Sequence, residues 1–218
     1  ALIFSFFFRL RVKLYTWRIL RSEAVSASVL AIGNLTAGGT GKTPLVAHLI
    51  EKLNQLGFKT AIVSRGYRAQ LKGPVKVDPR RERAVELFGD EPTWLAQQLP
   101  KTSVFVGRDR VAASWAAIAD CDPQIIVADD GFQHLRLQRQ QNIVVLDATE
   151  PKWHYWPLPA GRAREGFRAL RRAQLVVISK VNWADPEQLK WLKAKVQKAV
   201  PHLMIAEFEY RIGSFSRL

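Results

Sequence analysis

The fold is decided by residues 28–44, SVLAIGNLTAGGTGKTP. A short apolar run comes first, a glycine-rich turn follows it, and the pattern after the turn is that of a helix beginning at Lys42. Glycines let the backbone fold tightly, so that successive N–H groups and the helix N-terminus point at phosphate oxygens. The order of strand, glycine-rich turn, Gly-Lys-Thr and helix therefore predicts a phosphate-binding loop (P-loop).

The predicted P-loop assigns a role to several of its residues. Lys42 is expected to reach the β- and γ-phosphates, and the Thr43 hydroxyl to ligate Mg²⁺. The usual pattern has a glycine where this sequence has Thr36, but the later glycines still supply the flexibility. We expect ATP with Mg²⁺ to bind at Thr36, Ala37, Gly38, Gly39, Thr40, Gly41, Lys42 and Thr43.

Beyond the P-loop, short apolar runs alternate with longer helix-like stretches, which is typical of a parallel α/β sheet buried on both faces. Strands are expected at 28–32, 60–64, 103–106, 124–128, 142–146, 175–179 and 204–208. Helices are expected at 42–56, 91–98, 110–119 and 186–199, and loops at 66–80 and 150–165. We predict an α/β fold of the P-loop NTPase type, mostly parallel and flanked by helices, as one core over 26–218.

The composition narrows the class of partner. An apolar fraction of 48% excludes wholesale disorder. Lys and Arg number 33 against 19 acids, a net charge of +14, which favours an anionic partner such as nucleic acid, an acidic membrane surface or a phosphorylated substrate. The single cysteine, Cys121, excludes a disulfide framework or a multi-cysteine metal site and is expected to be a half-buried structural thiol.

Residues 1–25 are predicted to associate with a membrane. They begin ALIFSFFF, and five cationic residues follow before the first acid, Glu23. The apolar run is too short to span a bilayer, which takes roughly 20 residues, and a signal peptide would place its charges before the run. We expect a helix whose aromatic end dips into the bilayer while its cations meet anionic headgroups; a hydrophobic helix packed on the core is the alternative.

Carboxylates follow the strand expected at 124–128. A P-loop enzyme needs a carboxylate at the tip of a neighbouring strand to hold Mg²⁺, and Asp129 and Asp130 stand there. Adjacent aspartates repel each other, so a cation or a basic neighbour is the natural reason to keep them together. Asp147, at the end of another strand, is a competing candidate, and we favour the doublet. His134 is either a substrate contact or a structural histidine.

Two further clusters bear on the phosphoryl acceptor. The sequence GDEP at residues 89–92 opens a helix, with Asp90 at the expected N-cap, so ordinary capping is the alternative to a catalytic role. The sequence PAGRARE at residues 159–165 follows a tryptophan-rich stretch. Loops of this kind serve as lids that place a guanidinium on the transferring phosphate.

Five motifs together resemble those of the tetraacyldisaccharide 4′-kinases. They are GNLTAGGTGKTP at 33–44, SRGY at 64–67, GDEP at 89–92, DDGFQH at 129–134, and PAG with RE at 159–165. These enzymes phosphorylate the 4′-hydroxyl of the lipid A disaccharide precursor. The resemblance implies a kinase using ATP and Mg²⁺, held peripherally at the cytoplasmic face of the inner membrane of Gram-negative bacteria. It implies the lipid precursor and the anionic membrane surface as partners. We expect no nucleic-acid partner and a monomer.

The resemblance also implies roles for individual residues. Asp90 matches the base that accepts the sugar hydroxyl proton, and Arg164 the residue that stabilises charge in the transition state, with Lys42 as a third catalytic residue. The metal and active-site carboxylates implied are Asp129, Asp130 and Glu165, beside Thr43. Substrate contacts are expected from Asn34, Arg65, Tyr67, Gln133 and His134.

The family continues into a second, C-terminal lobe whose histidine pairs with the base aspartate. This sequence ends at Leu218, and the setting of its late histidine, His202, is different, so the lobe is expected to be missing or truncated.

Two rival functions are a membrane-associated GTPase or ATPase switch and a nucleic-acid ATPase. The first rests on SKVN at 179–182, which resembles a guanine-reading element; an aspartate there accepts two bonds from guanine, and the amide of Asn182 cannot. The second predicts aromatic residues interleaved with cations along one groove, whereas here they concentrate at the N-terminus and at 153–156.

Overall fold

The structure, a computed structural model, describes residues 10–67, 69–71 and 73–211. Its centre is an eight-stranded sheet in the order β3-β4-β2-β5-β1-β6-β7-β8. The strands are β1 Ser28–Asn34, β2 Thr60–Ser64, β3 Val75–Lys76, β4 Ser103–Val106, β5 Ile125–Asp129, β6 Gln141–Asp147, β7 Leu175–Ser179 and β8 Met204–Phe208. Every neighbouring pair is parallel except β3 with β4, which confirms the predicted mostly parallel α/β fold.

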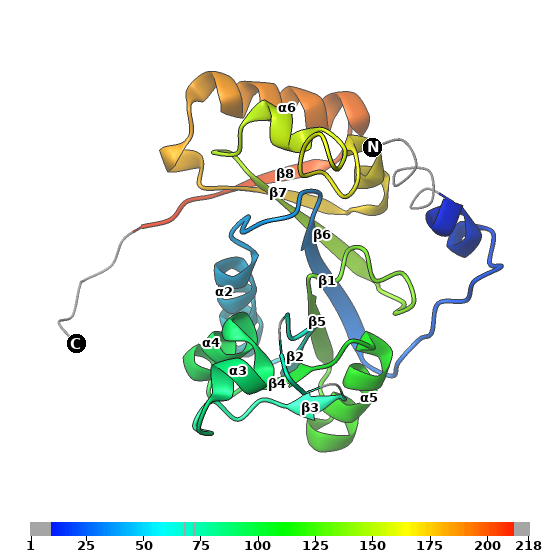
Figure 1. Ribbon diagram of the computed structural model, residues 1–218, viewed down its shortest axis with the longest axis vertical. Coiled ribbons are helices and arrows are strands. Elements are labelled where there is room, and N and C mark those ends of the chain that lie inside the picture. The colour runs from blue at the N-terminus through cyan, green and yellow to red at the C-terminus, as the bar shows by residue number, and fades with distance from the viewer. Residues whose placement is uncertain (1–9, 68, 72, 212–218) are drawn as a thin grey trace.

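Helices cover the sheet on both faces. They are α2 Lys42–Gln55, α3 Ala84–Phe88, α4 Asp90–Gln98, α5 Arg110–Cys121 and α6 Pro186–Ala199, with 3₁₀ turns η1 Lys152–Tyr155, η2 Phe167–Arg172 and η3 Val181–Trp183. Figure 1 shows α6 beside β7 and β8 at one end of the sheet, and α2 to α5 around the other. The chain between 150 and 175 connects the neighbouring strands β6 and β7 and forms backbone bonds with the turn that follows β1.

The two faces of the central strands form two separate parts of the core. Successive side chains of a strand point to opposite faces, and Ile32 packs with Val46 and Ile50 of α2, whereas its neighbour Ala31 packs with Ala117 of α5. All five are fully buried. Burial of β1 on both faces fixes the P-loop, which follows it, relative to the rest of the sheet.

The predicted element boundaries are close to those observed, with differences at polar ends and short elements. β1 continues to Asn34, and β5 and β6 each continue to the aspartate that follows the apolar run. β3 and α3 were not predicted: β3 has only two residues, inside the loop expected at 66–80, and α3 only five. Elements this short carry no readable hydrophobic period.

The N-terminal segment runs along the outside of the sheet. Residues 10–16 are helical, and the chain is then held by backbone bonds from Glu23 N to Arg136 O at 2.7 Å and from Gln138 N to Glu23 O at 2.8 Å. Trp17 and Ile19 are 61% and 65% exposed. The apolar run, residues 1–8, lies outside the described residues. In the part of the chain that is described, no helix has the length and apolar character needed to cross a bilayer.

Candidate active site

The P-loop is the turn between β1 and α2, and the loop at 150–165 holds it in place. Gly41, the N-cap of α2, has φ 77°, a left-handed conformation that favours glycine. Ala37 N donates to Arg162 O at 2.7 Å, and the buried Thr36 hydroxyl donates to Glu150 Oε2 at 3.0 Å. Thr36, which replaces the usual glycine, therefore anchors the P-loop to its neighbour.

Asp130 lies between two cations at the end of β5. Its carboxylate is 3.7 Å from Lys42 Nζ and 3.1 Å from a guanidinium nitrogen of Arg164. Burial of Asp130 opposes its ionisation, but Lys42 and Arg164 outweigh that effect and lower its pKa. The structure therefore brings together the P-loop lysine, one aspartate of the doublet and the arginine of the loop at 150–165, three residues predicted to act at one site.

Asp129 has the opposite electrostatic setting. It is 1% exposed; Ser64 Oγ donates to its Oδ2 at 3.1 Å, and its Oδ1 has no hydrogen-bond partner in the described part of the chain. Burial, together with the charge of Asp130, raises its pKa. A buried carboxylate oxygen without a partner at the tip of a strand beside a P-loop fits a hard divalent cation such as Mg²⁺.

The competing carboxylate, Asp147, is already satisfied. Its Oδ1 accepts from the Thr149 backbone and hydroxyl at 2.8 and 2.6 Å, and its Oδ2 pairs with Lys180. Because both carboxylate oxygens of Asp147 already have partners, the geometry favours the doublet Asp129–Asp130 as the metal ligands.

Glu165 lies apart from the doublet. It forms an ion pair with Arg172 and accepts a bond from Gln133 Nε2 at 3.1 Å. Within residues 10–67, 69–71 and 73–211, no group of three or more His, Cys, Asp or Glu side chains could hold a metal ion. The expectation that Glu165 gathers with both aspartates around the metal therefore differs from the structure, because Arg172 and Gln133 hold it elsewhere.

The other predicted substrate contacts divide into buried and exposed residues. Asn34 is fully buried beneath the P-loop, and Gln133 donates to its backbone oxygen at 2.8 Å. Both residues therefore stabilise the P-loop turn. Burial, with the nearby Arg110, lowers the pKa of His134 to about 4, which keeps it neutral at neutral pH. Arg65 and Tyr67 follow β2 and are exposed.

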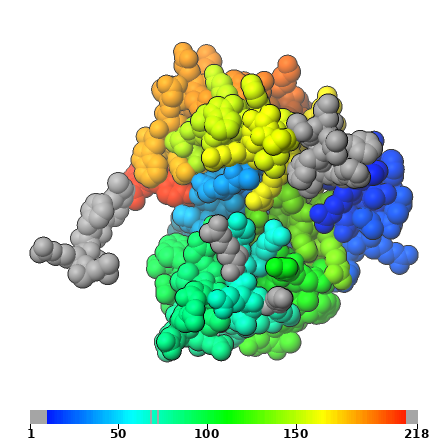
Figure 2. All heavy atoms as spheres, viewed as in Figure 1, coloured from blue at the N-terminus to red at the C-terminus, as the bar shows by residue number. Residues whose placement is uncertain are grey.

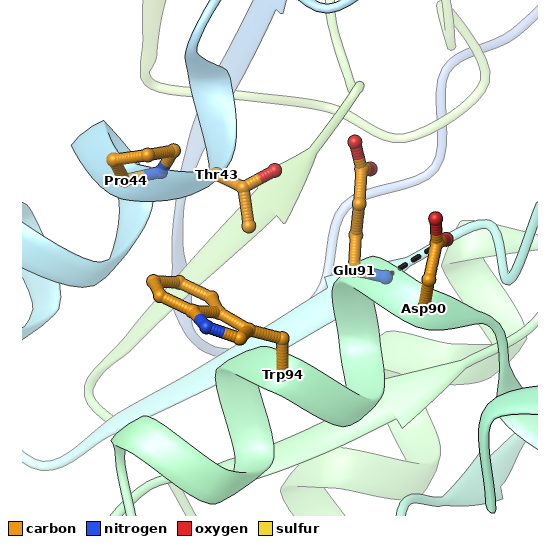
Figure 3. Close-up of a pocket in the computed structure, with 5 residues that line it drawn as sticks. All are labelled: Thr43, Pro44, Asp90, Glu91 and Trp94. Atoms are coloured by element: carbon orange, nitrogen blue, oxygen red, sulfur yellow. Dashed lines mark hydrogen bonds between the residues drawn. The ribbon is translucent and has the colours of Figure 1, made fainter. Parts of the chain in front are cut away.

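Asp90 opens helix α4 and lines two cavities. One, of about 260 Å³, lies between the helix starts of α2 and α4; Figure 3 shows its lining residues, Thr43, Pro44, Asp90, Glu91 and Trp94. The other, of about 370 Å³, is lined by Tyr67, Gln70, Val85, Glu86, Gly89 and Asp90. Asp90 therefore borders both the P-loop and a second space outside it.

The expectation that Asp90 is an ordinary N-cap is wrong. Gly89, with φ 95°, occupies the N-cap, and Asp90 is the first helical residue. Among the described residues, its Oδ1 accepts from the adjacent Glu91 N, at 2.9 Å. In Figure 3 the carboxylates of Asp90 and Glu91 point the same way, and Glu91 lies between Asp90 and Thr43.

Two charged residues of the site were missed from the sequence. Burial and then the charge of Asp129 raise the pKa of Glu91, and Arg110, 4% exposed at the start of α5, lies in the field of the aspartate doublet. Glu91 stands beside Asp90 in the GDEP motif, a signal that was available. Nothing in the sequence around Arg110 separates it from a surface arginine.

The fold and the site define a P-loop nucleotide-binding protein with a mostly parallel sheet. The fold alone is shared with the signal recognition particle 54 kDa protein of Aeropyrum pernix K1, at a TM-score of 0.51 and 13% identity over 85% of this chain and 42% of that one. Within this class the chain belongs to the tetraacyldisaccharide-1-P 4′-kinase family, whose family model matches residues 1–212. The predicted family is thereby confirmed.

Named relatives agree with this placement. A tetraacyldisaccharide 4′-kinase of Bdellovibrio bacteriovorus is 45% identical over 78% of this chain and 50% of its own length. That of Geobacter sulfurreducens is 40% identical over 83% and 52%. The crystal structure of LpxK from Aquifex aeolicus in complex with ATP has a TM-score of 0.75 and 30% identity, over 98% of this chain and 60% of that one. The chain spans about half the length of the curated relatives it matches.

Proposed function

We propose that this chain carries the nucleotide site and the catalytic base of a kinase. The kinase transfers the γ-phosphoryl group of ATP to the 4′-hydroxyl of a tetraacyldisaccharide 1-phosphate, the lipid A precursor. The observation that carries the proposal is the position of Asp90 between two cavities, one bordered by the P-loop residue Thr43 and the other by Tyr67. ATP approaches Asp90 from the first and the acceptor from the second. Membership of the kinase family supports the same assignment.

The reaction follows from the charges around Asp90. Asp90 accepts the proton of the acceptor hydroxyl while that oxygen forms its bond to the γ-phosphorus. The bond from the γ-phosphorus to the β–γ bridging oxygen breaks, and ADP leaves. Lys42 and Arg164, which both reach Asp130 in this structure, stabilise the negative charge on the transferring group.

The residues present fit a magnesium ion. Thr43 through its hydroxyl, and Asp129 and Asp130 through their carboxylates, would hold it, and the unpartnered Oδ1 of Asp129 is the observation that favours this set. When bound, Mg²⁺ neutralises charge on the β- and γ-phosphate oxygens.

The site of action that we propose is the cytoplasmic face of the inner membrane, with the protein attached peripherally. Arg11, Lys13, Arg18 and Arg21 lie on the N-terminal segment next to the exposed Trp17. Basic and aromatic residues together are suited to an anionic lipid surface, which is where a lipid-linked acceptor would be found.

The test is transfer of labelled γ-phosphate from ATP to a disaccharide-1-phosphate lipid in detergent micelles. Asp90→Asn is expected to lower the rate by about 10²–10⁴-fold, the usual contribution of a general base, while ATP still binds. Asp120→Asn, in an exposed pair with Lys76, is the matched control and should keep the parent rate. Undiminished transfer by the Asp90 variant would contradict the assignment. Intact ATP binding with no transfer would contradict catalysis by these 218 residues alone.

A further inference from the structure

An aromatic pair lies beside the P-loop, outside the machinery described above. Trp183 follows β7 and Tyr210 follows β8, and their ring centroids are 5.6 Å apart with the planes inclined at 31°. The Tyr210 hydroxyl donates to Gly41 O at 2.8 Å. Burial raises the pKa of Tyr210 to about 12, so the hydroxyl remains a donor at neutral pH. The pair is therefore tied directly to the N-cap of α2.

Asn182 fixes the position of Tyr210. Its Nδ2 donates to Tyr210 O at 2.8 Å, and Tyr210 N donates to its Oδ1 at 3.2 Å. Both ends of the amide are thus bonded to one backbone residue. Asn182 stands where a guanine-reading aspartate would be, but it holds an aromatic side chain in place instead.

The charges on the two sides of β1 decide where the base of a nucleotide lies. Asp90 and the doublet of β5 are on the β5–β2 side of the sheet, so the γ-phosphate, which must face the acceptor, points that way. The remainder of the nucleotide then extends toward β6 and β7. On that side Lys180 Nζ is 3.4 Å from Gly39 O. Trp183, three residues after Lys180, is 53% exposed and packs against Tyr210, which contacts Gly41.

We propose that Trp183 and Tyr210 form the stacking surface for the purine base of the bound nucleotide, and that Asn182 positions Tyr210 against the P-loop. This inference rests on the proposed function, since it assumes a nucleotide at the P-loop. Stacking recognises the flat face that all bases share. The surface therefore accounts for base binding without the hydrogen-bond reading that Asn182 is unable to provide.

The test compares a ligand that has a base with one that has only phosphates. Binding of ATP and of inorganic tripolyphosphate, each with Mg²⁺, is measured by calorimetry on the 218-residue chain. Tyr210→Ala is expected to weaken ATP binding by about tenfold or more and to leave tripolyphosphate unchanged, whereas Tyr210→Phe stays close to the parent. Trp183→Ala should likewise weaken ATP binding and leave tripolyphosphate binding unchanged. Trp115→Ala, an exposed tryptophan on α5, is the matched control and should bind both ligands normally.

Three results would overturn the inference. Equal losses for both ligands in Tyr210→Ala would mean that the tyrosine only supports the P-loop, and unchanged ATP binding would mean that it does not meet the base. A change in Tyr210→Phe as large as that in Tyr210→Ala would place the effect in the hydroxyl rather than the ring. Failure of the parent chain to bind either ligand would instead reject the proposed function. Thermal unfolding of each variant separates these outcomes from misfolding, and Trp183→Ala tests the surface without touching the Gly41 contact.

Discussion

At the scale of single residues, the aspartate doublet shows how position within a few ångströms changes the role of a side chain. Asp130 is held by Lys42 and Arg164, while Asp129 is buried with one oxygen unpartnered. The Asp130 carboxylate therefore stabilises the folded chain, whereas the Asp129 carboxylate destabilises it until a cation binds. Their opposite pKa shifts lead to two opposite predictions.

Asp129→Asn is expected to stabilise the nucleotide-free chain at neutral pH. Because its pKa is raised in the folded chain, stability is lost as the pH rises from the ordinary aspartate range through that raised pKa. The neutral variant avoids this loss and can still accept the bond from Ser64. Thermal unfolding should show a midpoint a few degrees higher at neutral pH, with the gain vanishing on acidification below the ordinary aspartate pKa. Mg²⁺-dependent ATP binding should weaken by at least about tenfold. A less stable variant at neutral pH would contradict this account.

Asp130→Asn is expected to do the reverse. Its pKa is lowered in the folded chain, so its contribution is present above the ordinary aspartate pKa and is lost as the pH falls through the lowered value. The variant leaves the buried Lys42 without its carboxylate and should lose about 1–3 kcal/mol of unfolding free energy at neutral pH. Urea unfolding at several pH values measures this. A deficit that persists unchanged in strong acid would point to a packing defect instead.

At the scale of elements, the P-loop depends on the loop at 150–165. Thr36 Oγ1 donates to the buried Glu150, and the backbone bond from Ala37 to Arg162 runs alongside. Burial raises the pKa of Glu150, and the bond from Thr36 is its largest opposing influence. The two loops therefore act as one unit, and damage to one should reach the nucleotide site.

Thr36→Val tests that coupling. Valine keeps the shape but removes the donor, which leaves a buried acceptor unsatisfied at a cost of about 1–3 kcal/mol. We expect lower stability in chemical unfolding together with weaker ATP binding. Thr16→Val, which removes an exposed hydroxyl bond on the N-terminal helix, is the control and should change stability by no more than about 0.5 kcal/mol. Loss of stability with unchanged ATP affinity would show that the P-loop keeps its shape without this anchor.

Helix α6 offers a prediction independent of the site. The Asp185 side chain accepts bonds from Glu187 N and Gln188 N at its N-terminus, with Pro186 at the first turn. Asp185→Ala should cost about 0.5–2 kcal/mol of unfolding free energy, whereas Asp185→Asn, an equally good cap, should restore most of it. Equal losses in both variants would mean that the charge, rather than the cap, is what stabilises the helix.

The sequence predicted the elements that have a clear period or a motif, and missed what depends on distant contacts. The P-loop, the strands with long apolar runs and the position of the doublet followed from local pattern. The partners of Glu165 and Asp147 did not, because Arg172 and Lys180 come from other segments whose side-chain directions no local pattern gives. The contact of Tyr210 with the P-loop could not be predicted either, since it depends on how β8 ends beside α2.

At the scale of the whole molecule, the net charge of +14 is the property that acts over the longest distance. Charge of this size attracts any anionic surface at low salt, so attraction by itself says little. A specific membrane contact differs from this general attraction because it involves one place on the protein surface. Figure 2 shows residues 10–25, in blue, on one flank of the molecule, away from the end of β8.

Binding to lipid vesicles should therefore depend on the N-terminal cations and not on charge in general. We expect sedimentation with vesicles containing anionic phosphatidylserine, weakening as salt rises, because each Lys or Arg near such a surface contributes about 1 kcal/mol. The double change Arg18→Glu with Arg21→Glu should reduce binding by about tenfold or more. Lys190→Glu with Lys198→Glu, exposed on α6, alters the net charge equally and should have a much smaller effect. Equal losses of vesicle binding in the two double variants would mean that the interaction depends on net charge alone. Unequal losses would locate the membrane-facing side, and hence the direction from which a lipid acceptor comes to Asp90.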